Sequence, residues 1–138
     1  MVSLIINADD LGLTPAVSRG IFESITNGVV PRTSAMMCSE NSYLIKKYLK
    51  DLDGKIGLHL QLTDGTSKLD RSQIPSLVDE DGLFPKKSNL LGHINKEEIE
   101  LEWNAQMNAF LELGIQPSHL DTHHNVHRFP KAFKAICS

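Results

Sequence analysis

The sequence contains no hydrophobic run long enough to cross a membrane, and only two of its 138 residues are cysteines. A membrane-spanning helix needs about 20 consecutive apolar residues, so no transmembrane segment is predicted. Cys38 and Cys137 stand far apart without a CxxC pair, which argues against a disulfide framework. The N-terminus, residues 1–7, has neither the basic region nor the length of a signal peptide. These absences favour a cytoplasmic protein.

Positive charge is also sparse: 14 lysines and arginines stand against 17 acidic residues and form no basic stripe. The net charge of -3 argues against a general nucleic-acid-binding role. There is no glycine-rich phosphate loop and no GxSxG motif of serine hydrolases. With 41% hydrophobic and 22% charged residues, the composition is that of an ordinary globular domain. We therefore expect neither nucleic acid nor a membrane as a partner.

Apolar runs typical of strands alternate along the chain with patterns typical of helices. Strands are predicted at residues 2–6, 33–38, 56–63 and 115–122, and helices at residues 14–28, 42–50, 96–113 and 130–136. This order is typical of parallel strands joined by helical crossovers. We predict one α/β domain over residues 1–138, built as an open doubly wound sheet or as half of a barrel. Because the pattern stops early in the last helix, we expect the domain to be truncated at its C-terminus.

The stretch between the third strand and the third helix, residues 64–95, is irregular and rich in Asp, Gly, Ser, Pro and Lys. A loop of this length inside a compact domain tends to be a functional loop. We therefore predict a substrate lid over residues 64–95.

Side chains able to bind a metal accompany three of the predicted strands. Asp9 and Asp10 come just after the first, His59 lies on the polar face of the third, and His123 comes just after the fourth. Ligands of parallel sheets bind beyond the carboxyl ends of the strands, so we expect these side chains to converge. A divalent cation would neutralise one of the two adjacent carboxylates and leave the other as a base. The alternative is that one Asp caps the following helix and the other is solvated.

Four of the six histidines fall within nine residues, in the segment 119–127. This density favours a metal-binding or acid–base role over a merely polar loop. Spacing alone does not decide which of His119, His123, His124 and His127 would bind a metal. His59 taken alone is more typical of a half-buried strand histidine that is hydrogen-bonded to a neighbour.

Three stretches resemble the YdjC-like family, the chitooligosaccharide deacetylase group related to polysaccharide deacetylases. They are residues 6–12 (INADDLG), 56–63 (IGLHLQLT) and 119–127 (HLDTHHNVH), and residues 30–34 (VPRTS) also resemble the segment that enters the second strand. The resemblance implies a deformed barrel of parallel strands, here its N-terminal part, and a divalent metal held by an Asp and two His. The chain departs from the family at Asn125, often a third consecutive His, and at Leu11, often an aromatic residue.

The resemblance also implies site residues and a reaction. By position, Asp10, His59 and His123 would hold the metal, usually magnesium, and Asp9 would be the general base. The implied reaction removes an acetyl group from an N-acetylated amino sugar or oligosaccharide, through water that the metal activates. We expect His127 to protonate the leaving amine. Because imidazole suits transition metals, zinc, manganese and cobalt stay open beside magnesium.

Two other functions are compatible with the same residues. One is a metal-dependent sugar isomerase or aldolase on a barrel, in which the metal would stabilise an enediolate. The other is a non-catalytic domain that binds metal or sugar. In each case the expected partner is a small carbohydrate, and a homodimer is the expected assembly.

Overall fold

A curled parallel sheet forms the centre of the computed structural model, which describes residues 4–86 and 93–138. The sheet has the strand order β1-β2-β3-β4, and each neighbouring pair is parallel. Its strands are β1 (Asn7–Leu11), β2 (Arg32–Ala35), β3 (Ile56–Leu60) and β4 (Leu120–Thr122). The predicted α/β arrangement of parallel strands is therefore confirmed.

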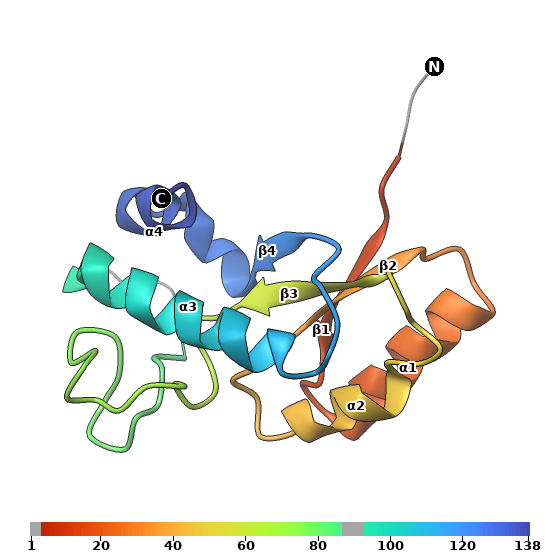
Figure 1. The fold of residues 1–138 in the computed structure, drawn as a ribbon, viewed down its shortest axis with the longest axis horizontal. Coiled ribbons are helices and arrows are strands. Elements are labelled where there is room, and N and C mark those ends of the chain that lie inside the picture. Colours follow the sequence, from red (N-terminus) through yellow and green to blue (C-terminus); the bar gives the residue numbers. More distant parts are fainter. Residues whose placement is uncertain (1–3, 87–92) are drawn as a thin grey trace.

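Helices precede and follow the strands as predicted. They are α1 (Pro15–Thr26), the 3-10 helix η1 (Ser42–Leu44), α2 (Ile45–Tyr48), α3 (Lys96–Leu111), the kinked 3-10 segment η3 (His123–Arg128) and α4 (Pro130–Ile136). Figure 1 shows α1 and α2 together at one end of the molecule and α3 with α4 at the other. Within the described ranges, no helix has both the length and the apolar character needed to span a membrane.

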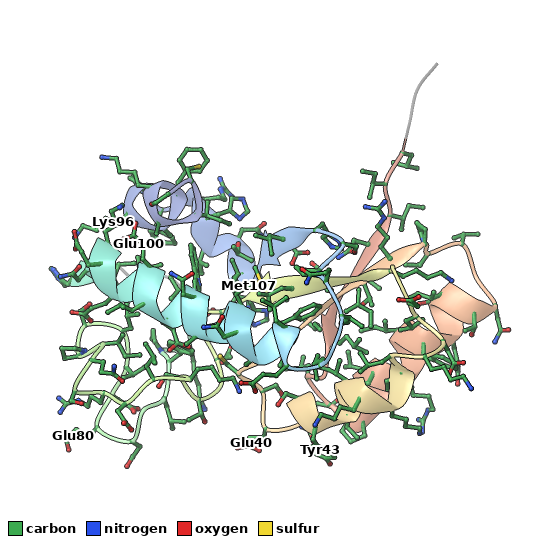
Figure 2. The ribbon with its side chains drawn as sticks, viewed as in Figure 1. Glu40, Tyr43, Glu80, Lys96, Glu100 and Met107 are labelled. Carbon is green, nitrogen blue, oxygen red and sulfur yellow. The ribbon has the colours of Figure 1, made fainter. Side chains whose placement is uncertain are left out.

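Side-chain contacts hold each pair of helices together. The rings of Phe22 in α1 and Tyr48 in α2 pack with their centroids 5.1 Å apart. At the other end, Glu100 of α3 accepts a hydrogen bond of 2.6 Å from the hydroxyl of Ser138, which follows α4. Within α3, Glu100 also forms an ion pair with Lys96 (Figure 2).

The first strand lies later in the chain than the predicted range of residues 2–6. Residues 2 and 3 fall outside the described part, residues 4–6 are exposed, and β1 begins at Asn7. Pairing starts at Asn7 with Arg32, and the residue before Arg32 is Pro31, which has no N–H to extend a ladder. As a consequence, Asp9 and Asp10 lie within the first strand and not after it.

Several other elements are shorter than predicted. β2 covers four residues where 33–38 are predicted, β4 covers three where 115–122 are predicted, and α3 ends at Leu111. The range 42–50 divides into η1 and α2. Residues 36–38 are nonetheless buried, because the apolar pattern reports burial whereas a ladder also needs a neighbouring strand. The helix that Thr14 caps is as predicted, and the Thr14 hydroxyl accepts a hydrogen bond from the Val17 N–H.

α3 buries polar side chains as well as the apolar ones that its spacing predicts. Glu102 and Gln106 are both 0% exposed. The Glu102 carboxylate accepts hydrogen bonds from the backbone N–H groups of Lys68 and Leu69, at 3.0 and 3.1 Å, and from Gln106 Nε2 at 2.9 Å. Gln106 in turn exchanges two hydrogen bonds of 2.9 Å with the backbone of Gln61. The segment that follows β3 is therefore anchored to α3 by a buried polar network.

We expect Glu102→Ala to lower the free energy of unfolding by about 2–4 kcal/mol, because it removes a fully buried side chain and leaves the partly buried N–H groups of Lys68 and Leu69 unpaired. Urea unfolding of the metal-free protein measures this loss. The control is Glu112→Ala, since Glu112 is exposed at the end of the same helix and its removal should change stability by less than about 0.5 kcal/mol. Equal effects of the two substitutions would show that the network does not stabilise the fold.

Candidate metal centre

A bulge in β1 directs the side chains of the adjacent residues Asp9 and Asp10 into different surroundings. Ala8 pairs with Thr33 and Leu11 pairs with Ala35, so Asp9 and Asp10 together oppose a single residue of β2. Asp10 has a φ of 73°, a left-handed conformation that is costly for a residue with a side chain. Bulges re-aim side chains in this way. Asp9 is left exposed, whereas Asp10 is partly buried against the neighbouring histidines.

Asp10, His59 and His123 come together in the structure. Asp10 Oδ1 lies 3.2 Å from His59 Nε2 and 3.0 Å from His123 Nδ1, and these two ring nitrogens are 3.3 Å apart. His59 and His123 are only 2% and 6% exposed. Three donor atoms from β1, β3 and η3 thus converge on one point, and the arrangement could hold a metal ion.

Contacts within this cluster shift the pKa values of His59 and Asp10. Burial lowers the pKa of His59, but contacts with Asp10 and Asp121 more than offset it and raise the pKa to about 9. The pKa of Asp10 is held well below its usual range, by His123 first and His59 second, although burial opposes the shift. In the absence of a metal, a protonated His59 therefore faces ionised carboxylates.

A row of hydrogen-bonded polar side chains, with one member from each strand, crosses one face of the sheet. Asn7 Nδ2 donates to Ser34 Oγ at 3.1 Å, Ser34 Oγ lies 3.2 Å from His59 Nδ1, and His59 Nδ1 lies 2.6 Å from Asp121 Oδ1. Asn7 Nδ2 also reaches Asp121 Oδ2 at 3.2 Å, which joins the first strand to the fourth. Those two strands would be about 14 Å apart in a flat sheet. The sheet must therefore curl towards this row of side chains.

Asp121 and Asn7 are functional candidates that sequence reasoning missed. Asp121 is the register partner of His59 in the β3–β4 pair, so their side chains emerge side by side on one face. Asn7 Nδ2 contacts Asp121 and also donates to Asp9 Oδ1 at 2.7 Å. Both residues lie inside the stretches that resemble the family, which was the available signal. Their contacts depend on strand register, which the sequence pattern does not specify.

The remaining clustered histidines lie around the three converging side chains. His119 packs on Gly57, where a Cβ atom would come within 2.5 Å of the ring, and its Nδ1 lies 2.9 Å from Ser118 Oγ. His124 is exposed and stacks on His123, with the ring centroids 3.9 Å apart. His127 Nδ1 lies 2.6 Å from Thr122 Oγ1. Of the four, only His123 joins Asp10 and His59.

A small cavity adjoins this cluster. It has a volume of about 190 Å³, and its lining includes Ser39, Glu40, Asn41 and Asp64. Asp64 Oδ2 lies 3.5 Å from His123 Nε2, so one side chain borders both the cavity and the histidines. A cavity of about 430 Å³ elsewhere, between α3 and α4 and beside Met107 (Figure 2), is lined by none of the predicted site residues.

The raised pKa of His59 predicts how the stability of the metal-free protein depends on pH. Folding favours the protonated ring, so its contribution is complete below the ordinary pKa of 6.5 and is lost as the pH rises through about 9. We expect a loss of roughly 2–3 kcal/mol over that range, measured by urea unfolding. His59→Gln should abolish this pH dependence, whereas His93→Gln, at an exposed histidine, should keep it. A flat profile in the unsubstituted protein would contradict the coupling.

Comparison with known proteins gives a consistent set of matches. A family profile described as YdjC-like protein matches residues 3–138. Carbohydrate deacetylases from Enterococcus faecalis (strain ATCC 700802 / V583) and Geobacillus stearothermophilus are 44% and 36% identical, over 90% and 96% of this chain. The alignments cover 49% and 53% of those proteins, so the chain spans about half the length of the curated relatives it matches.

A solved structure is similar as well. It is a crystal structure from Enterococcus faecalis V583, described as a cellobiose-phosphate cleavage protein, with a TM-score of 0.88 and 40% identity. The match covers 96% of this chain and 52% of that one. Together with the curled parallel sheet, this likeness confirms the predicted fold class, an α/β arrangement that forms part of a deformed barrel.

Proposed function

Because the chain belongs to the family of YdjC-like proteins, we propose that it carries the metal centre of a carbohydrate deacetylase. The proposed reaction removes the acetyl group from an N-acetylated amino sugar or oligosaccharide by attack of water on the amide. The relatives named carbohydrate deacetylase support this class of reaction. The observation that carries the proposal is the contact of Asp10 with both His59 and His123.

The three side chains fit a divalent cation. Donor atoms that share one ion at about 2.1 Å lie roughly 3.0–3.4 Å from one another, and the three here are 3.0–3.3 Å apart. Asp10 Oδ1 is also buried without a well-formed hydrogen bond to any described residue. The family implies Mg²⁺, and two imidazoles beside a carboxylate also suit Zn²⁺, Mn²⁺ or Co²⁺. When bound, such a cation would polarise the acetamide carbonyl and make a water molecule easier to deprotonate.

Asp9 is the proposed general base. Its side chain is exposed, and Asn7 Nδ2 holds its Oδ1 at 2.7 Å, which leaves Oδ2 to take a proton from water. The same Asn7 amide contacts Asp121, the partner of His59. The Asn7 amide therefore links the Asp9 carboxylate to the pair formed by Asp121 and His59.

His127 is the proposed acid that protonates the leaving amine. The Thr122 hydroxyl accepts the backbone N–H of His127 at 3.3 Å, and it lies 2.6 Å from Nδ1 of the same residue. As a general acid, His127 would act in its protonated form, in which Nδ1–H donates to the Thr122 hydroxyl. The Nε2–H proton would then be the one given to the leaving amine.

The cavity beside Asp64 is the proposed place for the sugar. Serine, asparagine and carboxylate side chains in its lining can bind hydroxyl groups. The segment between β3 and α3 begins at this cavity, and we propose that the predicted lid, residues 64–95, covers bound substrate; residues 87–92 of it lie outside the described part of the chain. Cytoplasmic location and a homodimer stay predictions.

The proposed roles are separated by measuring acetate release and metal affinity together. With the full-length protein, we expect Asp10→Asn and His123→Gln to weaken metal binding and to lower kcat/KM roughly 10²–10³-fold or more. Asp9→Asn should lower kcat about 10²–10⁴-fold while leaving metal affinity nearly unchanged, because a base acts only in the reaction. The substrates are N-acetylated amino-sugar oligosaccharides, tested with Mg²⁺, Zn²⁺, Mn²⁺ and Co²⁺.

The matched control is Glu112→Gln, which also converts a carboxylate to an amide. Glu112 is exposed, follows α3 and lies outside both the metal centre and the segment proposed to cover the substrate. It should leave both measurements unchanged. Failure to release acetate from any of these substrates with any of the metals would refute the deacetylase proposal, and ketose–aldose interconversion would instead support an isomerase. An Asp9→Asn variant with full activity would remove Asp9 from the role of base.

A further inference from the structure

Each of the two buried histidines faces Asp10 with one ring nitrogen and a second carboxylate with the other. In His59, Nε2 faces Asp10 at 3.2 Å and Nδ1 faces Asp121 at 2.6 Å. In His123 the order is reversed, because Nδ1 faces Asp10 at 3.0 Å and Nε2 faces Asp64 at 3.5 Å. The two rings are therefore turned in opposite senses about the same point.

The carboxylate behind His59 is held firmly. The β3–β4 register places Asp121 directly beside His59, and Asn7 Nδ2 fixes its other oxygen at 3.2 Å. An ionised carboxylate only accepts hydrogen bonds, so the ring nitrogen at 2.6 Å must carry the proton. In the neutral ring, the form that binds a metal, the proton would then stay on Nδ1 and the Nε2 lone pair would be directed at the point that Asp10 also faces.

The carboxylate behind His123 is held by the segment that follows β3. Gln61, anchored to α3, donates a hydrogen bond of 2.8 Å from its side chain to the Asp64 backbone oxygen. Asp64 has a φ of 54°, so its place is imposed by the surrounding contacts. His123 is nine-tenths buried, and its Nε2 faces the Asp64 carboxylate at 3.5 Å, so its Nδ1 lone pair is the one left for a cation.

We propose that Asp121 and Asp64 are positioning residues that hold the two histidines in opposite tautomers, His59 with its proton on Nδ1 and His123 with its proton on Nε2. The metal would then be bound by His59 Nε2 and His123 Nδ1. A carboxylate behind a ligand histidine fixes the tautomer and the ring orientation and makes the ligand nitrogen more basic. This inference rests on the proposed metal centre and adds the atoms that bind and the groups that orient them.

Asp64 has a second histidine within reach, and burial decides between the two. Asp64 Oδ2 lies 3.6 Å from His124 Nδ1, so Asp64, His123 and His124 could themselves hold an ion. The His124 side chain is 45% exposed, and its Nδ1 already lies 3.1 Å from Thr63 Oγ1. The buried ring of His123 depends on Asp64 more than the solvated ring of His124 does.

The tautomers can be read directly by nitrogen NMR. The experiment uses full-length protein with ¹⁵N-labelled histidine rings, loaded with one equivalent of Zn²⁺. We expect the His59 ring to show a proton on Nδ1 and the His123 ring to show a proton on Nε2. Asp121→Ala and Asp64→Ala should each weaken Zn²⁺ binding about 10–100-fold, measured by chelator competition. Glu112→Gln is the control and should bind Zn²⁺ as the unsubstituted protein does.

A merely structural role would give a different pattern. Circular dichroism and metal-free unfolding check that each variant folds, and Asp121→Asn, which keeps the shape of the side chain, replaces Asp121→Ala if that variant does not. Positioning predicts that Zn²⁺ affinity falls in folded protein and that the ring facing the lost carboxylate becomes a mixture of tautomers. A lower unfolding midpoint with unchanged affinity and unchanged tautomers would overturn the proposal.

The remaining outcomes separate this inference from the proposed function. If the protein binds one Zn²⁺ but both rings carry the proton on the same nitrogen, the tautomer assignment is wrong and the metal centre stands. Two Zn²⁺ ions per chain with His124 as a ligand would make Asp64 a ligand and also overturn the inference. If the unsubstituted protein binds none of the divalent metals, the proposed metal centre fails and the inference fails with it.

Discussion

The geometry of the candidate metal centre depends on the imidazole of His59, a buried ring whose two nitrogens both need polar partners. His59 is 2% exposed, and an unpaired buried polar group costs about 1–3 kcal/mol. Asp121 meets one nitrogen and Asp10 faces the other. Each partner requires a particular backbone: Asp121 needs the register of β4 against β3, and Asp10 needs the bulge in β1. The register of β4, the bulge in β1 and the curl of the sheet together give the His59 ring its polar partners.

The curl also explains why β3 is buried on both faces. Its alternating pattern, with Ile56, Leu58 and Leu60 on one side and His59 on the other, is typical of a sheet with one solvated face. In the structure every residue of β3 is buried. The polar face is covered by the side chains of the neighbouring strands, and Asn7 reaches Asp121 across it. This face is lined as the interior of a barrel is, so polar residues there are hydrogen-bonded and not solvated.

Sequence reasoning recovers the parts of the fold that local pattern determines. The element order, the Thr14 cap and the convergence of the aspartate pair, His59 and His123 follow from periodicity, turn signals and the parallel strands. The choice of Asp10 and His123 as the ligands comes from the family resemblance. The start of β1 could not be predicted, because the apolar run before it looks like a strand and only the pairing with β2 shows otherwise. Glu102 was missed for a related reason: helical spacing identifies apolar stripes, and a buried carboxylate stands out only once its partners are in place.

Asp121 and Asp64 show a deeper limit, because their importance lies in which atoms they face. A sequence shows that an aspartate stands two residues before His123, but not that it emerges beside His59 on the neighbouring strand. Register decides this, and a slip of one residue would send the side chain to the opposite face. Asp64 stands four residues after the end of β3, and the contacts that bring it near His123 include the anchoring of Gln61 to α3 and the hydrogen bond of the Asp64 N–H to the Pro85 oxygen.

Backbone strain and charge both concentrate at the cluster. The non-glycine residues with positive φ in the described part are Asp10, Asp64, His124 and Asn125, and all of them lie at or beside it. Such conformations cost of order 1–3 kcal/mol each and persist only where surrounding contacts impose them. The carboxylates gathered there repel one another, and without a metal the protonated His59 supplies the balancing positive charge. A divalent cation would supply the same charge and displace that proton, since ligand histidines bind metal in their neutral form. The proton on His59 and a divalent cation therefore compete for the same place beside these carboxylates.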